Sequence, residues 1–243
     1  MACSLWASHR DVAARVLDCV EVISEREIQQ GYRAALSSLS AWNIDPAVRT
    51  GQWLFLGFGK PGESGQSMLR LFREANSLTS ATYDSLFCSI TDLPSKRLTS
   101  RDYIIFVDDF SGTGRQVAGM RPTIQELVGA NANCFFIVTA ATRAAICKIT
   151  SETSLQLVSS IILEERDNVF HQQCVNFSED DCKILIRYGR RADNKNPRGF
   201  GECGLLFVLC HKTPNNTIPI LHAHHAKWKG LFPRYLQPAP VRG

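Results

Sequence analysis

The chain has 243 residues, 44% of them hydrophobic and 21% charged, with a formal net charge of +4. These values are ordinary for a soluble globular protein, and the length allows one large α/β domain with appended pieces or two small domains. No apolar run is long enough to cross a bilayer and the start lacks a basic-then-apolar signal, so we expect neither a membrane segment nor a signal peptide. The mild net charge permits an acidic partner without requiring one.

The nine cysteines are an odd number and include no Cys-x-x-Cys pair. Several stand in apolar segments, among them Cys88, Cys134 and Cys210. Cysteines in such positions are typical of reduced core residues, and we therefore expect a cytoplasmic protein.

Apolar residues at helical spacing run from residue 8 to residue 42, and Asn43-Ile44-Asp45-Pro46 ends the pattern. We predict an N-terminal helical extension over residues 1–48 that packs on the main domain. A surface for docking a partner is the alternative.

The next segment, residues 53–58, is nearly all apolar, as expected for a strand buried on both faces. A Gly-rich loop with a lysine follows at 59–65, and then a helical pattern begins. Strand, loop and helix in this order form a candidate anion site. It is not a Walker A loop, because Glu63 follows Gly62 where that motif needs lysine. A plain turn capped by Ser64 explains the segment equally well.

The stretch at 103–116, YIIFVDDFSGTGRQ, combines a β-branched apolar run with two carboxylates, a short loop and a segment that can start a helix. We predict a buried strand whose carboxyl end presents Asp108 and Asp109. Paired acids beside a phosphate loop suit ribose hydroxyls or a Mg²⁺ ion held jointly with a polyphosphate. The alternative is an ordinary strand and turn with solvated acids, but adjacent acids at a buried strand end are costly without partners.

The loop after these acids favours an anion. Gly112 and Gly114 permit backbone angles closed to other residues, and Ser111 and Thr113 add hydroxyl donors. Unpaired N–H groups and the dipole of a following helix both attract phosphate.

Strands are also predicted at 83–91, 134–140 and 155–163, with helices after Gly114 and at 142–151. This alternation predicts an α/β fold with a doubly wound, mostly parallel sheet. We place the α/β core at residues 49–190. In such sheets ligands bind beyond the carboxyl ends of the strands, where the 59–65 and 108–114 loops would both lie.

A helix predicted at 179–188 leads into a basic run between Arg187 and Arg198, opposed only by Asp193. This run could contact nucleic acid or an acidic partner, although most short basic runs are merely solvated and the sequence shows no aromatic stacking platform beside it.

Residues 191–243 form a predicted C-terminal hood and tail, with a strand at 205–209 and a Thr-Pro-Asn-Asn-Thr turn at 213–217 between apolar segments expected to be strands. His222, His224 and His225 raise the alternative of a zinc site. Their spacing matches no standard finger, so a surface cluster or a substrate contact is the simpler interpretation.

The 103–116 stretch resembles the phosphoribosyl-pyrophosphate loop of type I phosphoribosyltransferases. Together with residues 53–76 and with the tail, which contains Thr-Pro-Asn-Asn-Thr, Trp228 and Leu231-Phe232-Pro233-Arg234, it is similar to a phosphoribosyltransferase-like family of bacterial conflict (anti-phage defence) operons. The resemblance covers roughly residues 50–235. Some relatives accompany retrons, beside a reverse transcriptase and a DNA-binding protein.

The resemblance implies a site for phosphoribosyl pyrophosphate and Mg²⁺. It places Asp108 and Asp109 at the ribose hydroxyls and the metal, and Lys60 at the pyrophosphate, assisted by Gly62, Ser64 and Gly65. The residues that would wrap the 5′-phosphate are Ser111, Gly112, Thr113, Gly114, Arg115 and Gln116. A mobile loop containing Lys96 and Arg97 would close over the site, although a solvated loop explains these two residues as well.

The implied reaction is transfer or release of the phosphoribosyl group, and no general base is evident in the sequence. Gln116 departs from the family pattern, in which many members carry Thr or Ser at this position. A non-catalytic sensor that binds a phosphoribosyl compound or nucleotide is therefore the alternative.

Overall fold

The computed structural model describes residues 2–59, 63–128 and 132–234. Contacts group the chain into two compact units. One, the sheet unit, is Arg26–Ile162, and the other, the terminal unit, combines Met1–Glu25 with Leu163–Gly243. This grouping differs from the domain boundaries predicted at residues 48 and 190, which stay a prediction.

The sheet unit is built on four strands in the order β2-β3-β4-β5. Their bounds are β2 Trp53–Gly57, β3 Tyr103–Ser111, β4 Asn133–Thr142 and β5 Gln156–Leu163. The pairs β2–β3 and β3–β4 are parallel, with Phe55 opposite Ile105 and Ile105 opposite Phe135. The predicted α/β fold with a parallel sheet is confirmed.

The strand order reverses between β2 and β3. Phe87 forms a parallel bridge with Phe55, and the Cys88 N–H donates to the Phe55 carbonyl at 3.3 Å. After β2, the segment around Phe87 therefore runs along one edge of β2. The chain then crosses to the other edge of β2, where it forms β3. Such a reversal opens a crevice at the carboxyl ends of the two strands.

The prediction of a strand over residues 83–91 is wrong. Only the segment around Phe87 is extended, between two 3₁₀ helices, η1 Ala81–Leu86 and η2 Ile90–Lys96. Ser80 and Ser89 cap these helices, and Asp92 completes a capping box with Ser89. Short polar side chains that bond the nearby backbone compete with a strand ladder.

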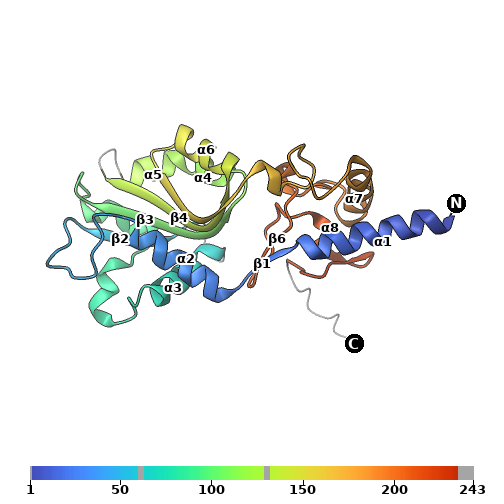
Figure 1. Ribbon diagram of the computed structural model, residues 1–243. Helices are drawn as coiled ribbons and strands as arrows, with labels where there is room; N and C mark the ends of the chain where they lie inside the picture. Colours follow the sequence, from blue (N-terminus) through green and yellow to red (C-terminus); the bar gives the residue numbers. More distant parts are fainter. Residues whose placement is uncertain (1, 60–62, 129–131, 235–243) are drawn as a thin grey trace, which may run out of the picture. The chain divides into compact units, whose positions relative to one another are not determined.

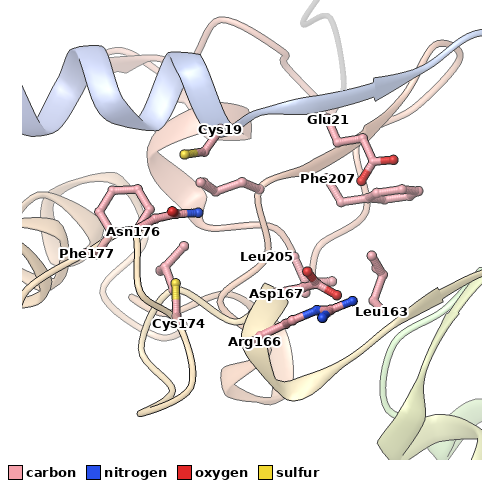
Figure 2. A pocket seen from close by; sticks show the side chains of 12 residues that line it. Cys19, Glu21, Leu163, Arg166, Asp167, Cys174, Asn176, Phe177, Leu205 and Phe207 are labelled. Carbon is pink, nitrogen blue, oxygen red and sulfur yellow. The ribbon is translucent and has the colours of Figure 1, made fainter.

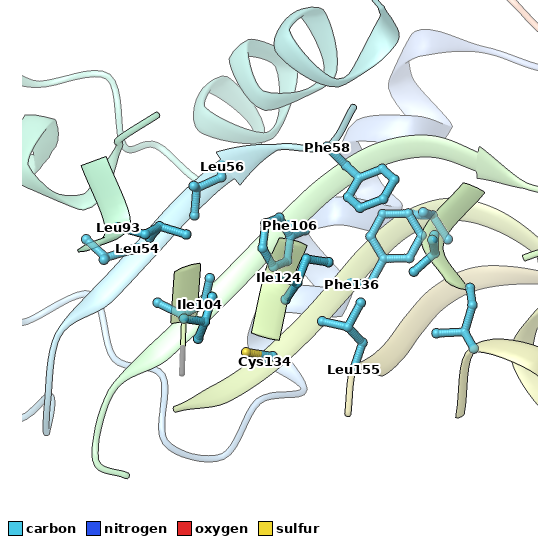
Figure 3. Packing of buried hydrophobic residues seen from close by; sticks show 14 of the residues in the cluster. Leu54, Leu56, Phe58, Leu93, Ile104, Phe106, Ile124, Cys134, Phe136 and Leu155 are labelled. Atoms are coloured by element: carbon cyan, nitrogen blue, oxygen red, sulfur yellow. The ribbon is translucent and has the colours of Figure 1, made fainter. Parts of the chain in front are cut away.

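Helices cover both faces of the sheet (Figure 1). On one face lie α2 Glu25–Ser37 and α3 Ser64–Ala75, where Phe55 packs on Phe72 and Phe72 on Tyr32. On the other lie α4 Arg115–Gly119, α5 Arg121–Val128 and α6 Arg143–Glu152. Figure 3 shows the apolar cluster on this second face. Its members include Leu54, Leu56, Ile104, Phe106, Ile124, Phe136 and Ile149.

Side chains of each strand alternate between these faces, because successive residues of a strand point to opposite sides. The helix expected after Gly114 is divided at Met120 into α4 and α5, and Pro122 lies in the first turn of α5, where its missing N–H costs nothing.

The terminal unit contains α1 Ala2–Cys19, β1 Glu21–Ile23, α7 Glu179–Ala192, β6 Phe207–Leu209 and α8 Pro219–His222. The short helices η3 Glu165–Asp167 and η4 Phe200–Glu202 and the hairpin of β7 His224–His225 and β8 Trp228–Lys229 complete it. β1 pairs in parallel with β6, so both ends of the chain build one small sheet. Its core includes Val12, Val16, Phe177, Leu185, Ile218 and Leu221.

Two further expectations are corrected here. A strand, β1, interrupts the segment that was expected to be helical, and the apolar segment after the Thr-Pro-Asn-Asn-Thr turn forms the helix α8, with Pro219 as its first residue. The turn itself is tied into the unit, since Asn216 Nδ2 donates to the Phe200 carbonyl at 2.9 Å and Thr213 Oγ1 to the Phe232 carbonyl at 2.8 Å.

Among the described residues, no helix has the length and apolarity needed to span a membrane, and no disulfide joins the cysteines. Cys134 is buried and Cys88 half-buried, as expected, but Cys210 is exposed and is not a core residue.

α3 lies unusually close to the end of β2. A Cβ atom on Gly65 would lie 1.9 Å from the Phe58 carbonyl oxygen, and one on Gly57 would lie 2.6 Å from the Gly65 carbonyl oxygen. Two glycines therefore allow the first turn of α3 to approach the strand end directly.

We predict that Gly65→Ala lowers the free energy of unfolding by about 1–3 kcal/mol, because backbone atoms must move apart. Denaturant unfolding measures this. Gly119→Ala is the matched control, since nothing lies within 4 Å of its Cβ position, and an exposed helical Gly→Ala change should be stabilising by up to about 1 kcal/mol. Equal effects of the two changes would contradict the close approach.

Candidate functional site

The loops after β2 and β3 meet at the crevice between these strands. Ser64 Oγ, in the first turn of α3, donates to Asp108 Oδ1 at 2.8 Å. Gln116 Nε2, in the first turn of α4, donates to Glu63 Oε2 at 3.2 Å. Two hydrogen bonds thus connect loops about fifty residues apart in the chain. The two loops together form one candidate site.

Asp108 and Asp109 are both buried, with 6% and 8% of their surface exposed. Asp108 is held from three directions: Ser64 donates to its carboxylate, the Asp109 N–H donates to the same oxygen at 2.9 Å, and Tyr32 Oη donates to its backbone carbonyl at 2.8 Å. Tyr32 belongs to α2, so an element far upstream fixes the end of β3. The Asp108 carboxylate is therefore fixed by hydrogen bonds rather than solvated.

Burial raises the pKa of the Asp108 carboxyl far above its usual range, and the negative charge of Asp109 raises it further. The hydrogen bonds from Ser64 and from the Asp109 N–H act in the opposite direction but do not cancel this. Two carboxylates that share a low-dielectric site cannot both ionise easily. The pair is therefore suited to a cation or to hydroxyl donors, which would replace the missing water.

The loop after the acids is fixed by α6. The Gly112 carbonyl accepts a hydrogen bond from Thr142 Oγ1 at 2.6 Å, and Thr142 also caps α6. Gly114 has φ +66°, and a Cβ there would lie 3.0 Å from the Ala145 carbonyl oxygen. The glycine is thus required by both its backbone angle and its neighbours. A loop held in this way keeps its N–H groups in place for an anion.

The remaining loop residues differ in accessibility. Ser111 ends β3 and is buried. Thr113 is half-buried, and its Oγ1 accepts a hydrogen bond from the backbone N–H of Arg115 at 3.4 Å, whereas Arg115 and Gln116 are exposed. The hydroxyl and the exposed side chains are therefore available to a ligand in the crevice.

Of the residues predicted to form the site, the structure joins Ser64 to Asp108, with Gly65 and Asp109 as their chain neighbours; their role in binding stays a prediction. Lys60 and Gly62 lie outside the described residues. The Lys96 carbonyl accepts from Gln52 Nε2 at 3.2 Å, and Gln52 precedes β2, so this segment lies at the amino ends of the strands. The prediction that Lys96 and Arg97 close over the crevice is not supported by that placement.

Two contributors were not found in the sequence. Tyr32 belongs to a helix with no motif pointing to the site, and Glu63 stood out only as the residue that breaks a Walker A pattern. Their partners are 76 and 53 residues away, so no local signal could identify them.

Residues 7–234 match the family model PRTase-CE. The chain belongs to this family. Its members are phosphoribosyltransferase-like proteins of conflict systems, so the predicted resemblance is confirmed. No curated protein matches the chain. Among solved structures, it is similar to orotate phosphoribosyltransferase from Aeropyrum pernix, with 13% identity and a TM-score of 0.32 over 54% of this chain and 70% of that chain.

Two histidines of the C-terminal cluster in this PRTase-CE protein bond the backbone. His222 Nε2 lies 3.1 Å from the Thr217 carbonyl oxygen, and His225 Nε2 lies 3.0 Å from that of Ala192. His222 ends α8 and His224 begins β7, so the two do not share one strand as the zinc alternative assumed. In the part of the chain that the structure describes, no three His, Cys, Asp or Glu residues form a group that could hold a metal ion.

A separate pocket lies within the terminal unit (Figure 2). The thiols of Cys19 and Cys174 line it together with the apolar side chains of Leu205 and Phe207. Burial is the main cause that raises the pKa of Cys19, which keeps this thiol protonated and a poor nucleophile. The pocket therefore offers no reactive group comparable to the Asp108–Asp109 pair.

The raised pKa of Asp108 gives a testable pH dependence. The folded protein binds this proton more tightly than the unfolded chain, so the stabilising contribution is present at low pH and is lost as pH rises through the raised pKa. We predict that Asp108→Asn raises the free energy of unfolding at about pH 8 by on the order of 1 kcal/mol, with little gain at about pH 4.

Chemical denaturation of ligand-free protein at both pH values measures this effect. Asp45→Asn, at an exposed turn where the carboxylate accepts from the Ala47 N–H, is the control. An Asp108→Asn protein less stable than the parent at the higher pH would show that the carboxyl is not held protonated by its surroundings.

Proposed function

We propose that this protein is an effector of a bacterial anti-phage defence system that binds phosphoribosyl pyrophosphate, or a related nucleotide, with Mg²⁺ and transfers or releases the phosphoribosyl group. The observation that carries the proposal is the Ser64–Asp108 hydrogen bond, which joins the two loops after the parallel strands β2 and β3, where the strand order reverses. Family membership supports the phosphoribosyltransferase-like part of the assignment.

The donor set fits Mg²⁺. This ion prefers oxygen ligands and is usually held by one or two carboxylates together with substrate phosphates, and Asp108 and Asp109 supply two buried carboxyl groups. When bound, the ion would neutralise charge that develops on the leaving pyrophosphate. The same acids would accept hydrogen bonds from the ribose hydroxyls, and charge assistance makes such bonds strong.

The two loops would divide the phosphates between them. The N–H groups of residues 111–116 and the Thr113 hydroxyl would bind the 5′-phosphate, while Ser64 and Lys60 would bind the pyrophosphate, with Lys60 as a point charge. Catalysis would then rest on stabilising the leaving group as the bond at ribose C1 breaks. The acceptor supplies the nucleophile, and none of the described residues that the loops bring together is a histidine that could act as its base.

The second assignment for the same crevice is a non-catalytic sensor of a phosphoribosyl compound or nucleotide. It is supported by Gln116, whose side chain bonds Glu63 and offers no hydroxyl to a phosphate. In either case we propose a cytoplasmic protein that works with partners encoded beside it, such as a reverse transcriptase or a DNA-binding protein if it accompanies a retron.

We expect isothermal titration to detect binding of phosphoribosyl pyrophosphate in the presence of Mg²⁺. Thr113→Val keeps the side-chain shape and deletes one donor to a charged group, so it should weaken binding by about 1–3 kcal/mol. Thr150→Val, on the exposed face of α6, should leave affinity unchanged. Pyrophosphate release in the same samples would favour the transferase, and binding without release the sensor. Absence of binding would reject both assignments.

A specific observation also favours nucleic acid as a partner of the terminal unit. Arg187, Arg190 and Arg191 are exposed on the last turns of α7. The β7–β8 hairpin brings aromatic rings beside them, since Trp228 lies 6.3 Å from Tyr188 between ring centroids and Arg191 lies 5.6 Å from the Tyr188 ring. The sequence alone does not predict this aromatic surface, because Trp228 is 40 residues away from Tyr188 in the chain. Positive charge beside aromatic rings, on which bases can stack, is the usual composition of a single-strand binding surface.

We predict that Arg187→Ala and Arg191→Ala each weaken the binding of a fluorescent single-stranded oligonucleotide severalfold and lower its salt dependence by about one phosphate contact. Fluorescence anisotropy at several salt concentrations measures both quantities. Lys183→Ala is the control, because Lys183 lies earlier on α7 and pairs with Asp180. If all three variants bind as the parent does, the basic segment is only solvated.

A further inference from the structure

Glu63 occupies an unusual position for a carboxylate. It immediately precedes α3, with extended backbone angles of φ −82° and ψ 176°, and its side chain makes no capping hydrogen bond to that helix. A side chain at this position normally gains stability by accepting from the first N–H groups of the helix. Here the carboxylate instead accepts from Gln116 of the opposite loop, at 3.2 Å.

The carboxylate also lies directly against the end of β2. Gly59 has φ +102°, and a Cβ on that residue would be 2.4 Å from Glu63 Oε2. The backbone angle favours glycine at this position, and the missing side chain leaves the space that the Glu63 carboxylate occupies. The Glu63 carboxylate therefore lies between Gly59, which follows β2, and Gln116 of α4. These residues belong to the two loops that form the crevice.

The charge of Glu63 opposes the ligand that the crevice would bind. Glu63 precedes Ser64, whose hydroxyl bonds Asp108, so its carboxylate adds a charge to the same pair of loops, and a phosphate group bound there would be repelled by each ionised carboxylate. The contact with Gln116 is a single exposed hydrogen bond, which contributes little to the stability of a fold.

We infer that Glu63 is a specificity-determining residue of this site, and that its carboxylate, held by Gln116, competes with the anionic groups of the ligand for the crevice between the loops. This inference rests on the proposed function. An entering pyrophosphate must displace Glu63, and the Gln116 amide is then free to donate to the ligand. A polyphosphate complexed with a divalent cation is repelled less by the Glu63 carboxylate than the metal-free anion is. The Glu63–Gln116 pair therefore selects for metal-complexed polyphosphates.

The test is Glu63→Gln, which keeps an oxygen able to accept from Gln116 and removes only the charge. Glu74→Gln is the matched control: the same change near the other end of α3, where Glu74 pairs with Arg70, about 15 Å away along the helix. Calorimetric titrations use pyrophosphate without metal and phosphoribosyl pyrophosphate with Mg²⁺, and melting temperatures verify that each variant is folded.

We expect Glu63→Gln to bind bare pyrophosphate about fivefold more tightly than the parent, with a smaller gain for the Mg²⁺ complex. The gain should shrink between about 50 mM and about 500 mM salt, because it is electrostatic. Glu74→Gln should match the parent.

Equal or weaker binding by Glu63→Gln, with the parent binding normally, would overturn the inference and leave the proposed function standing. If parent and variant both fail to bind either ligand, the proposed function fails, and the inference with it. Binding by the variant alone would support both.

Discussion

Two carboxyl groups taken out of water at the end of one strand constrain everything around them. A buried acid is costly unless it is hydrogen-bonded or neutralised, and Asp108 obtains its partners from α3, from its own neighbour in the chain and from α2 through Tyr32. Ser64 can reach it because α3 approaches β2 across Gly57 and Gly65. The position of the loops thus follows from the need to satisfy Asp108.

The cost of that arrangement supports the proposal that it serves binding rather than the fold alone. Asp102, a buried acid at the opposite end of β3, accepts from the Gln52 and Thr99 N–H groups and from the Thr99 hydroxyl, at 2.6–3.0 Å. It serves the fold. Asp108 has a second carboxylate beside it and a raised pKa, a combination that a purely structural position has no reason to keep. Perturbed acids in a crevice are the usual sign of a binding or catalytic site.

Much of the fold could be predicted from the sequence because its signals are local. Apolar runs mark β2, β3 and β4, and the segment from Asp108 to Gly114 carries its chemistry in consecutive residues. The failures have physical causes: Ser89 and Asp92 cap a 3₁₀ turn where a strand was expected, and Pro219 starts a helix. The contacts of Tyr32, Glu63 and Trp228 are set by tertiary packing, which no local pattern encodes.

The pairing of β1 with β6 has a consequence for the order in which the protein folds. A ribosome delivers β1 early and β6 only after the whole sheet unit has emerged, and closing so long a loop carries a large entropic cost and slows folding. The sheet unit can therefore assemble during synthesis, whereas α1 and β1 must wait with their apolar faces exposed. Until that last pairing forms, the nascent chain has a period of vulnerability to aggregation and to proteases.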